Sequence, residues 1–207
     1  MKKKPASEAR PAARDAGQTF GTRERVVRSA SRLMQRQGYD GTGIKQIAQE
    51  AEATLGSVYH FFPGGKQELA VAAIAHANGE FVADLKAVLD SEPDPARAVT
   101  AFSKHLAEEL RASDWTAGCP ITTTALGAAG RLPDVQVAAS EAFARQRELV
   151  SAKLSDCGFG EEEARELAHM VINTLEGAEI AAQVARSDDP LEIAGRHLAR
   201  MISAHRA

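Results

Sequence analysis

The stretch from Thr42 to Phe62 constrains the fold more than any other part of the chain, because it has the pattern of two short helices joined by a tight turn. Thr42 is a candidate N-cap for the first helix, whose apolar residues recur at helical spacing along one face. Thr54 offers the hydroxyl expected of a second N-cap, and Pro63 follows the second helix. Because such short helices cannot bury a core alone, the pattern indicates a helix-turn-helix, in which a preceding helix supports the first and the second enters a DNA major groove.

The second helix carries side chains suited to DNA. Leu55, Gly56 and Ser57, at its start, are small or slim enough to let the backbone approach base edges, and Leu55 can pack on a thymine methyl group. Tyr59 and His60 can donate hydrogen bonds to phosphates. Spacing alone leaves open that these two side chains are simply partly buried, because short helical pairs are common in all-α proteins. The predicted DNA-contacting set is Thr42, Lys45, Thr54, Leu55, Gly56, Ser57, Tyr59, His60 and Lys66.

The distribution of charge favours this interpretation, although the net charge of −3 does not. Residues 1–66 contain 12 basic and 6 acidic residues, whereas the rest of the chain contains 13 basic and 22 acidic residues. A basic head on an acidic body is typical of a DNA-binding domain joined to a domain with another task. Hydrophobic residues make up 44% of the chain, which is enough for a core, and only 5% of residues are aromatic, so Ala and Leu must supply most of the packing.

A larger set of residues keeps one register without gaps: Tyr39, Thr42, Ile44, Ile47, Ala48, Ala51, Thr54, Gly56, Ser57, Val58, Tyr59, His60, Phe61, Phe62 and Lys66. Together they resemble the signature of the TetR family of transcriptional regulators, over the region from Thr22 to Leu69. Glu52 departs from the family pattern, which usually has Gly in the joint between the two short helices. Because the backbone turns there through a left-handed conformation, a residue with a side chain costs about 1–2 kcal/mol.

The sequence predicts an all-α fold with two domains. An N-terminal three-helix helix-turn-helix domain is expected at residues 20–65, and a C-terminal six-helix ligand-binding and dimerisation bundle at residues 66–207. Residues 1–19 lack apolar periodicity and are predicted to be a disordered basic tail. Apolar periodicity, Pro and Gly place the helices outside the short pair at 22–37, 66–91, 96–112, 121–129, 132–156, 161–186 and 190–205.

The sequence does not favour a membrane or a secreted protein. No segment approaches the roughly 18 uninterrupted apolar residues of a transmembrane helix. No apolar run follows the lysines at positions 2–4, as a secretory signal would require. Cys119 and Cys157 have no paired spacing, which fits a reducing compartment. A cytoplasmic location is therefore expected.

An enzyme is not expected either. The run Gly64-Gly65-Lys66 resembles the end of a phosphate-binding loop, but the strand and the spacing that such a loop requires are missing. The six histidines are scattered, without an HExxH pair, and no Ser/His/Asp set can be assigned from spacing. Cys119 beside Pro120 is more often a small buried apolar residue than a nucleophile. The sequence therefore predicts no catalytic residue, no metal site and no cofactor.

The last two helices, residues 161–186 and 190–205, are expected to form a homodimer interface. The resemblance implies a two-fold four-helix contact at this place, so that two heads can reach the two halves of a palindromic operator. An apolar row along the terminal helix fits an interface with a partner. The row is Leu191, Ala194, Leu198, Met201 and Ile202.

The segment from Trp115 to Ile121 and the sequence from Phe62 to Lys66 are similar to the LmrA/YxaF-like branch of the family, some members of which respond to flavonoids. The resemblance implies a small hydrophobic or aromatic effector bound among the middle helices, in an apolar site with a few polar anchors. The alternatives stay open that these side chains form a solid core, and that the regulator is controlled by a protein partner or by its abundance. The predicted ligand-contacting residues are Phe81, Phe102, His105, Trp115, Cys119, Phe143, Met170 and Asn173.

Overall fold

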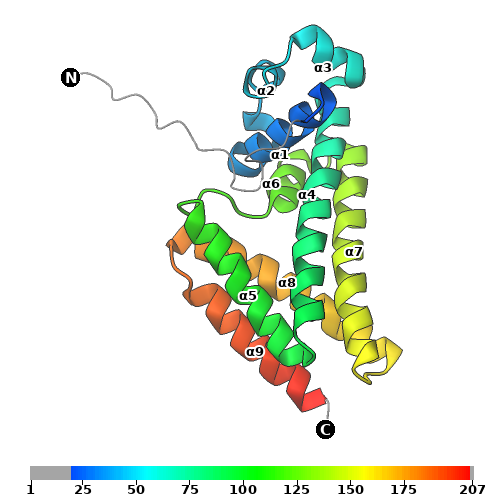
Figure 1. Cartoon of the computed structure of the whole chain (residues 1–207), viewed down its shortest axis with the longest axis vertical. Coiled ribbons are helices and arrows are strands. Elements are labelled where there is room, and N and C mark those ends of the chain that lie inside the picture. Colours follow the sequence, from blue (N-terminus) through cyan, green and yellow to red (C-terminus); the bar gives the residue numbers. More distant parts are fainter. Residues whose placement is uncertain (1–19, 206–207) are drawn as a thin grey trace, which may run out of the picture.

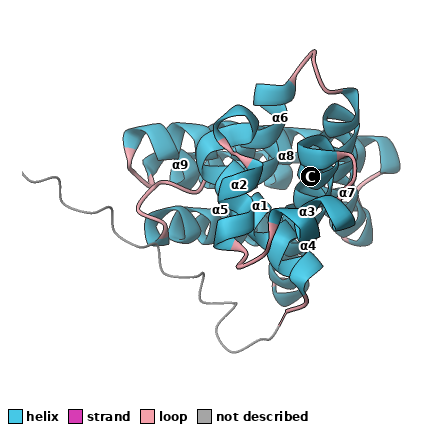
Figure 2. Cartoon of the chain, turned by 90° about the horizontal axis from the view of Figure 1, so that it is seen from above, coloured by secondary structure: helices cyan, strands magenta, loops and turns pink. Residues whose placement is uncertain are grey.

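A computed structural model describes residues 20–205, and these residues form helices and no strands (Figures 1 and 2). The prediction of an all-α fold is confirmed. The predicted disordered tail, residues 1–19, lies outside the described part of the chain. None of the described helices is both long and apolar enough to cross a membrane. The helices are α1 (Thr22–Gly41), α2 (Ile44–Glu50), α3 (Leu55–Phe61), α4 (Gly65–Ser91), α5 (Pro95–Ala112), α6 (Pro120–Ala128), α7 (Pro133–Asp156), α8 (Glu161–Ala185) and α9 (Asp189–His205).

Helices α1, α2 and α3 form a head at one end of the molecule, and the first half of α4 completes its core (Figure 1). Val58 and Phe62, at 0% and 1% exposure, fix α3 on this core together with the fully buried Ile47 of α2. Each such side chain stabilises the fold by roughly 1.5–3 kcal/mol. The same apolar cluster continues into α6 and α7. Head and body therefore share one core across the predicted boundary at residue 65.

Of the two N-caps predicted for the short helices, one is confirmed and the other is wrong. Thr54 accepts a hydrogen bond from the Ser57 backbone N–H at 3.0 Å, so this predicted N-cap is confirmed. Thr42 instead donates from Oγ1 to the Gly38 carbonyl oxygen at 2.8 Å, and Gly43 is the N-cap of α2. The predicted capping role of Thr42 is wrong, because its hydroxyl satisfies the carbonyl that the end of the preceding helix leaves free.

Helix α1 begins and breaks close to the predicted positions. Gly21, with extended backbone and no side chain, takes the N-cap position predicted for Thr22. Gly38 has φ of +69° and interrupts the helix where the sequence predicts its end, and a last turn then continues to Gly41. Only glycine enters this region without strain, so the break is encoded by a single residue.

The joint between α2 and α3 turns through Glu52, whose φ is +49°. The left-handed conformation expected at this position is therefore present, with a glutamate in it. Arg25 of α1 holds the joint from below, since its Nε donates to the Ala51 carbonyl oxygen at 3.0 Å and a second guanidinium nitrogen reaches the Glu52 carbonyl oxygen at 3.4 Å. The strain of one residue is thus offset by hydrogen bonds from the neighbouring helix.

Replacing Glu52 by glycine should stabilise the protein. Glycine removes about 1–2 kcal/mol of left-handed strain but loses roughly 0.5–1 kcal/mol in backbone entropy, so we expect Glu52→Gly to raise the free energy of unfolding by roughly 0.5–1 kcal/mol. Urea denaturation, followed by circular dichroism, measures this free energy of unfolding. Gln49→Gly, at an exposed helical position of α2, is the matched control and should destabilise by about 1 kcal/mol. Equal losses in both variants would show that the joint is not strained.

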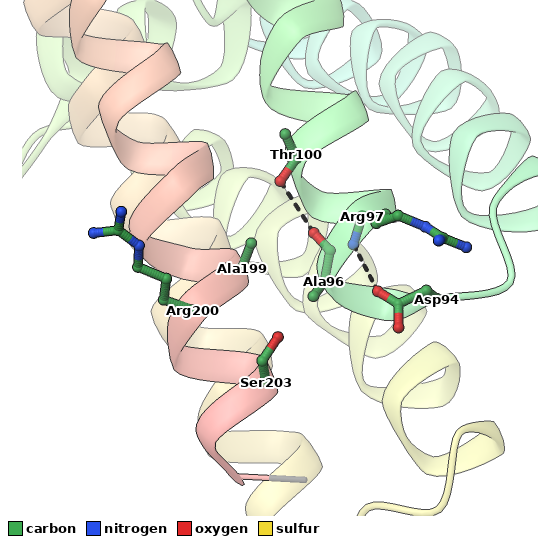
Figure 3. Close-up of a pocket in the computed structure, with 7 residues that line it drawn as sticks. All are labelled: Asp94, Ala96, Arg97, Thr100, Ala199, Arg200 and Ser203. Carbon is green, nitrogen blue, oxygen red and sulfur yellow. Dashed lines mark hydrogen bonds between the residues drawn. The ribbon is translucent and has the colours of Figure 1, made fainter.

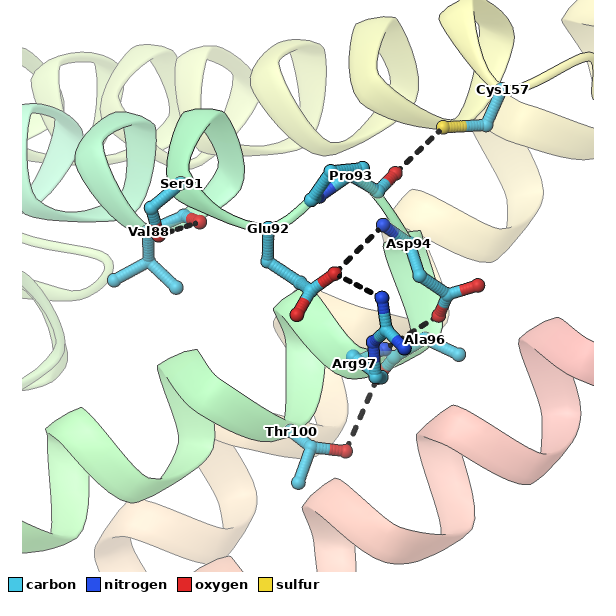
Figure 4. A network of polar contacts seen from close by, with 9 residues as sticks. All are labelled: Val88, Ser91, Glu92, Pro93, Asp94, Ala96, Arg97, Thr100 and Cys157. Atoms are coloured by element: carbon cyan, nitrogen blue, oxygen red, sulfur yellow. Dashed lines mark hydrogen bonds and ion pairs between the residues drawn. The ribbon is translucent and has the colours of Figure 1, made fainter.

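A network of hydrogen bonds fixes the turn from α4 to α5 (Figure 4). The Glu92 carboxylate accepts from the Asp94 backbone N–H at 3.0 Å and from the Arg97 guanidinium at 2.8 Å. These hydrogen bonds, the one from Arg97 first, lower the pKa of Glu92. Asp94 caps α5 by accepting from the Arg97 backbone N–H at 2.9 Å, and Pro95 occupies the first turn, where its missing N–H is not needed.

Helix α9 packs along α5, and the figures show the two side by side (Figures 1 and 2). Leu191, Ala194, Leu198 and Ile202 are buried in the core of the protomer itself, and Met201 packs against it. The prediction that this row faces a partner subunit is wrong, because α5 already covers it. Apolar periodicity shows that a helix face is covered and does not show which helix covers it.

Candidate DNA-contacting surface and ligand site

The outer face of α3 is exposed at the end of the head, beyond α1 (Figure 1). Leu55 and Tyr59 are 38% and 50% exposed, which is unusual for large apolar and aromatic side chains. Gly56 and His60 are exposed beside them. Tyr59 and His60 thus both reach solvent, and their contact with DNA stays a prediction. The four residues form one continuous face that a DNA major groove can accept.

The hydroxyl residues and the lysine of the predicted set lie around this face. Thr54 Oγ1 and Ser57 Oγ are 2.9 Å apart and hydrogen-bonded to each other. Lys45 is exposed near the start of α2. Thr42 is buried at 1% exposure and its hydroxyl is engaged with Gly38. Thr42 therefore presents no side-chain group to DNA in this conformation, and its place in the predicted set is corrected.

Lys66, at the start of α4, lies against Tyr39 rather than extending into solvent. Its Nζ is 4.3 Å from the centroid of the Tyr39 ring, a cation–π contact. Partial burial lowers the pKa of Lys66, and the nearby Asp40 carboxylate opposes this shift. The contact holds the ammonium group in one place. A phosphate contact through Lys66 stays a prediction.

Two arginines of α1 support the head in ways that local sequence patterns do not reveal. Arg25 binds the carbonyl groups of the joint, as described above, and the guanidinium of Arg23 lies 5.2 Å from the centroid of the Phe62 ring. In the sequence both residues belong to a set of five arginines in this helix, and arginines of a helix are usually exposed to solvent. The only sequence signal for their role is that a left-handed joint needs hydrogen-bond donors nearby.

Bulk added at Gly56 should abolish operator binding and leave the fold intact. A Cβ built at Gly56 meets only Thr54 Oγ1, at 3.7 Å, which is ordinary van der Waals contact. We therefore expect Gly56→Val to unfold within about 1 kcal/mol of the parent, while the larger side chain holds α3 away from the base edges. Gel-shift titration and thermal melting measure the two effects.

Gly79→Val is the matched control for that experiment. Gly79 is an exposed helical glycine of α4 with no atom within 4 Å of an added Cβ, so the same change there should leave DNA affinity unaltered. Operator affinity that is equal in both variants would contradict the placement of α3 in the groove.

Most of the predicted ligand residues gather inside the body. The rings of Phe81 and Phe102 meet edge to face at 5.3 Å between centroids, and the His105 ring lies 6.0 Å from that of Phe102. Trp115 and Phe143 are partly buried against the same core. Cys119 is buried in the other apolar cluster, which Phe143 also contacts. The sequence thus predicted a real aromatic group, with Phe143 at the junction of the two clusters.

Met170 and Asn173 do not belong to this group. Met170 is 50% exposed, and Asn173 is exposed three residues further along α8. Both lie on the outer face of the helix, so their prediction as ligand-contacting residues of an interior site is corrected. The sequence misled because α8 is rich in small and apolar residues on both faces.

Two hollows of the described surface lie elsewhere, between α5 and α9. The first has a volume of about 380 Å³ (Figure 3), and the second, of about 320 Å³, lies farther along the same pair of helices. None of the predicted ligand residues lines either hollow. The first is lined by Asp94, Ala96, Arg97, Thr100, Ala199, Arg200 and Ser203, and the second by Thr100, Ser103, Lys104, Glu192, Gly195 and Arg196.

Comparison with known proteins agrees with this geometry. Residues 26–73 match the family model of bacterial regulatory proteins of the tetR family, and residues 95–197 match that of the LmrA/YxaF-like transcriptional regulator C-terminal domain. The HTH-type transcriptional regulators YxaF and LmrA of Bacillus subtilis are 33% and 31% identical to this chain. Each match covers 82% of this chain, with 89% of YxaF and 90% of LmrA.

Solved structures give the same result. A TetR transcriptional regulator from Chloroflexus aurantiacus superposes with a TM-score of 0.72 at 28% identity, over 88% of this chain and 94% of its own. The TetR family regulator CifR, solved with a 26-bp double-strand operator DNA, superposes with a TM-score of 0.74 at 21% identity, over 92% of this chain and 98% of its own. At this identity, the similarity to CifR shows a shared fold.

The fold and the exposed face of α3 define a helix-turn-helix DNA-binding protein with a helical body. The chain belongs to the TetR family of DNA-binding transcriptional regulators, and its body matches the LmrA/YxaF-like branch of that family.

Proposed function

We propose that this chain is a homodimeric transcriptional repressor that binds a palindromic operator in the cytoplasm and is released by a small, mainly hydrophobic effector. The observation that carries the proposal is the exposed face of α3. Val58 and Phe62 anchor the helix on the head, while Leu55 and Tyr59 face outward. The solved complex of CifR with operator DNA supports the proposal, because that regulator shares the fold.

Lys66 and Tyr59 are proposed to contact the DNA backbone, and Leu55, Gly56 and Ser57 to contact bases. A cation on phosphate strengthens binding to all sequences and steepens its dependence on salt, whereas an apolar contact to a thymine methyl group distinguishes one base pair from another. Leu55 is exposed at the start of α3, so an A·T pair in each half-site fits it.

Two copies of α3 are needed, since a palindromic operator presents two major grooves about one helical turn, roughly 34 Å, apart. The outer face of α8 offers a surface for a second copy. Met170, Ile180 and Val184 are 50%, 46% and 81% exposed on this face. Together with Asn173 and Gly177, they recur every three or four residues, the spacing of a seam between packed helices. Ile193 of α9, at 48% exposure, is a further exposed apolar residue on the second predicted interface helix.

Charges on this face should separate the dimer. We expect Ile180→Glu combined with Val184→Glu to give a folded monomer by sedimentation velocity that no longer binds a palindromic operator, because obligate interfaces are large and apolar. Leu126→Glu is the matched control, since Leu126 is also exposed, at 70%, but lies on α6. Leu198→Glu should instead unfold the chain, because Leu198 is 3% exposed in the protomer core. A double variant that stays dimeric would place the contact elsewhere.

The effector is proposed to act among the aromatic residues of the body. Phe81, Phe102 and Phe143 supply apolar surface there, and His105 can anchor a polar group. Such a ligand would separate rings that now touch, and switching requires only about 1–3 kcal/mol of difference in affinity between the two states. The second candidate function is a DNA-binding regulator without small-molecule input. The direct packing of Phe81 on Phe102 and the position of both hollows favour it.

Trp115 allows the two candidates to be separated, because it is the only tryptophan of the chain. Duplexes that the protein selects from a random library give its operator, and a panel of planar aromatic compounds is then titrated. An effector of the proposed kind should quench Trp115 fluorescence and release the selected duplex at the same concentrations. In Trp115→Phe the fluorescence signal should vanish, whereas binding to the selected duplex should stay. Quenching by no compound, together with unaltered DNA binding, would leave the second candidate.

A further inference from the structure

The loop between α5 and α6, residues 113–119, touches both the body and the head; it is called the strap below. The Gly118 carbonyl oxygen accepts a hydrogen bond at 2.8 Å from Nε2 of Gln35 on α1. On the body side, a Cβ added to Gly118 would lie 2.6 Å from Oε1 of Gln183 on α8. The strap backbone therefore lies directly between a helix of the body and a helix of the head.

The start of the strap is held in a strained conformation. Asp114 and Trp115 are consecutive residues with φ of +54° and +62°, a region that residues with side chains avoid. Arg186, just beyond the end of α8, forms an ion pair with the Asp114 carboxylate and also donates to its carbonyl oxygen. Strain persists only where surrounding contacts fix it, and here α8 supplies one of those contacts.

Helix α6 continues this connection. Thr122 donates from its hydroxyl to Oε2 of Glu176 on α8 at 2.7 Å. On its other side α6 packs on α1, where a Cβ added to Gly38 would meet the Thr123 carbonyl oxygen at 3.5 Å. The strap and α6 together thus link α8 to the helix that supports α2 and α3.

Two carboxyl groups lie at the body side of this link. Glu179 is 7% exposed and follows Glu176 by three residues, so both side chains project from one face of α8. Neither forms an ion pair with a basic side chain among the described residues. The titratable group that acts on Glu179 is Glu176, and the one that acts on Glu176 is the thiol of Cys119, the buried last residue of the strap. The exposed Asp114–Arg186 pair lies at the far end of the strap.

We propose that the strap and α6 form a proton-operated latch between α8 and the head. With Glu179 protonated, Glu176 of α8 accepts the hydrogen bond from Thr122 of α6, and the strap holds Gln35. Ionisation of Glu179 places a second negative charge beside Glu176 in an apolar region, and the closed contact yields so that water can reach both carboxylates. The Gly118–Gln35 hydrogen bond is then lost, and α1 is no longer held by the body at this point.

The direction of the pH dependence follows from the pKa of Glu179. Burial, and then the charge of Glu176, raises this pKa from 4.5 to about 8 in the closed form. In an open form, where the Glu179 carboxyl is hydrated, its pKa returns to the ordinary value of 4.5. Between these two pKa values the ratio of open to closed form rises tenfold for each unit of pH, and above about pH 8 it becomes constant. Burial also raises the pKa of Cys119 well above its usual range, which keeps the thiol protonated.

Trp115 fluorescence and operator affinity, each measured from pH 7 to pH 9, test the latch. The emission of Trp115 should shift with a midpoint in this range, and affinity for the duplex selected by the protein should fall by up to tenfold. Glu179→Gln keeps the shape of the protonated side chain, so both responses should disappear. Glu166→Gln, at an exposed position on the same helix, is the matched control and should respond like the parent.

The variant Gln35→Leu separates the ionisation of Glu179 from its effect on the head. Because Gln35 lies on the head side, its variant should keep the pH response of Trp115 and weaken that of DNA affinity. A pH response of Trp115 that persists in Glu179→Gln, or its absence in the parent protein, would overturn the proposal. The fluorescence measurement needs no DNA, so it decides the proton step even if the chain selects no duplex and the proposed function fails.

Discussion

The surface that is proposed to contact DNA depends on the burial of the opposite side of a helix of seven residues. A helix as short as α3 does not persist in water by itself, because nucleation outweighs the few hydrogen bonds that it gains. The burial of Val58 and Phe62 against α1, α2 and α4 offsets this unfavourable free energy of helix formation. The Thr54 cap also satisfies one free amide. Since the buried side of α3 and its N-cap hold the helix on the head, the side chains on its outer face are not needed for the fold. Leu55, Gly56, Tyr59 and His60 are therefore free for the proposed contact with DNA.

The sequence predicted those features whose cause lies within a few residues. The Thr54 cap, the break at Gly38 and the left-handed joint at Glu52 each depend on local backbone chemistry, and the structure has all three. The features that it did not predict depend on partners far away in the chain. Arg25 reaches a carbonyl group 26 residues distant, and the apolar row of α9 is covered by α5 of the same protomer. An apolar row has the same sequence pattern whether the helix that covers it belongs to the same chain or to another. No local pattern could therefore identify the covering helix.

Most buried residues of α8 are apolar, but a few positions depart from the usual arrangement of polar and apolar residues. Glu179 is buried, whereas Val184, five residues later, is 81% exposed. An apolar region disfavours the charged form of a carboxyl group, so burial, together with the charge of Glu176, raises the pKa of Glu179 to about 8. The exposed apolar side chains of α8 are in contact with water, which is unfavourable. Burial against a second copy of the chain would remove this cost. Because apolar residues occur on both faces of α8, the sequence predicted an interior position for Met170 and Asn173, which are exposed.

The shared core decides how a change in the body can reach DNA. If head and body were separate units joined by a linker, a ligand or a proton in the body would leave the orientation of α3 unaffected. Here the first half of α4 and parts of α6 and α7 belong to the same cluster as α1, α2 and α3. Densely packed interiors do not deform continuously but exchange between discrete arrangements. A shift of α6 must therefore be accommodated at its extensive contact with α1, where Gly38 lies against Thr123 and Gly127 against Tyr39. Because α1 holds the joint between α2 and α3 through Arg25, its position and that of the DNA-contacting face change together.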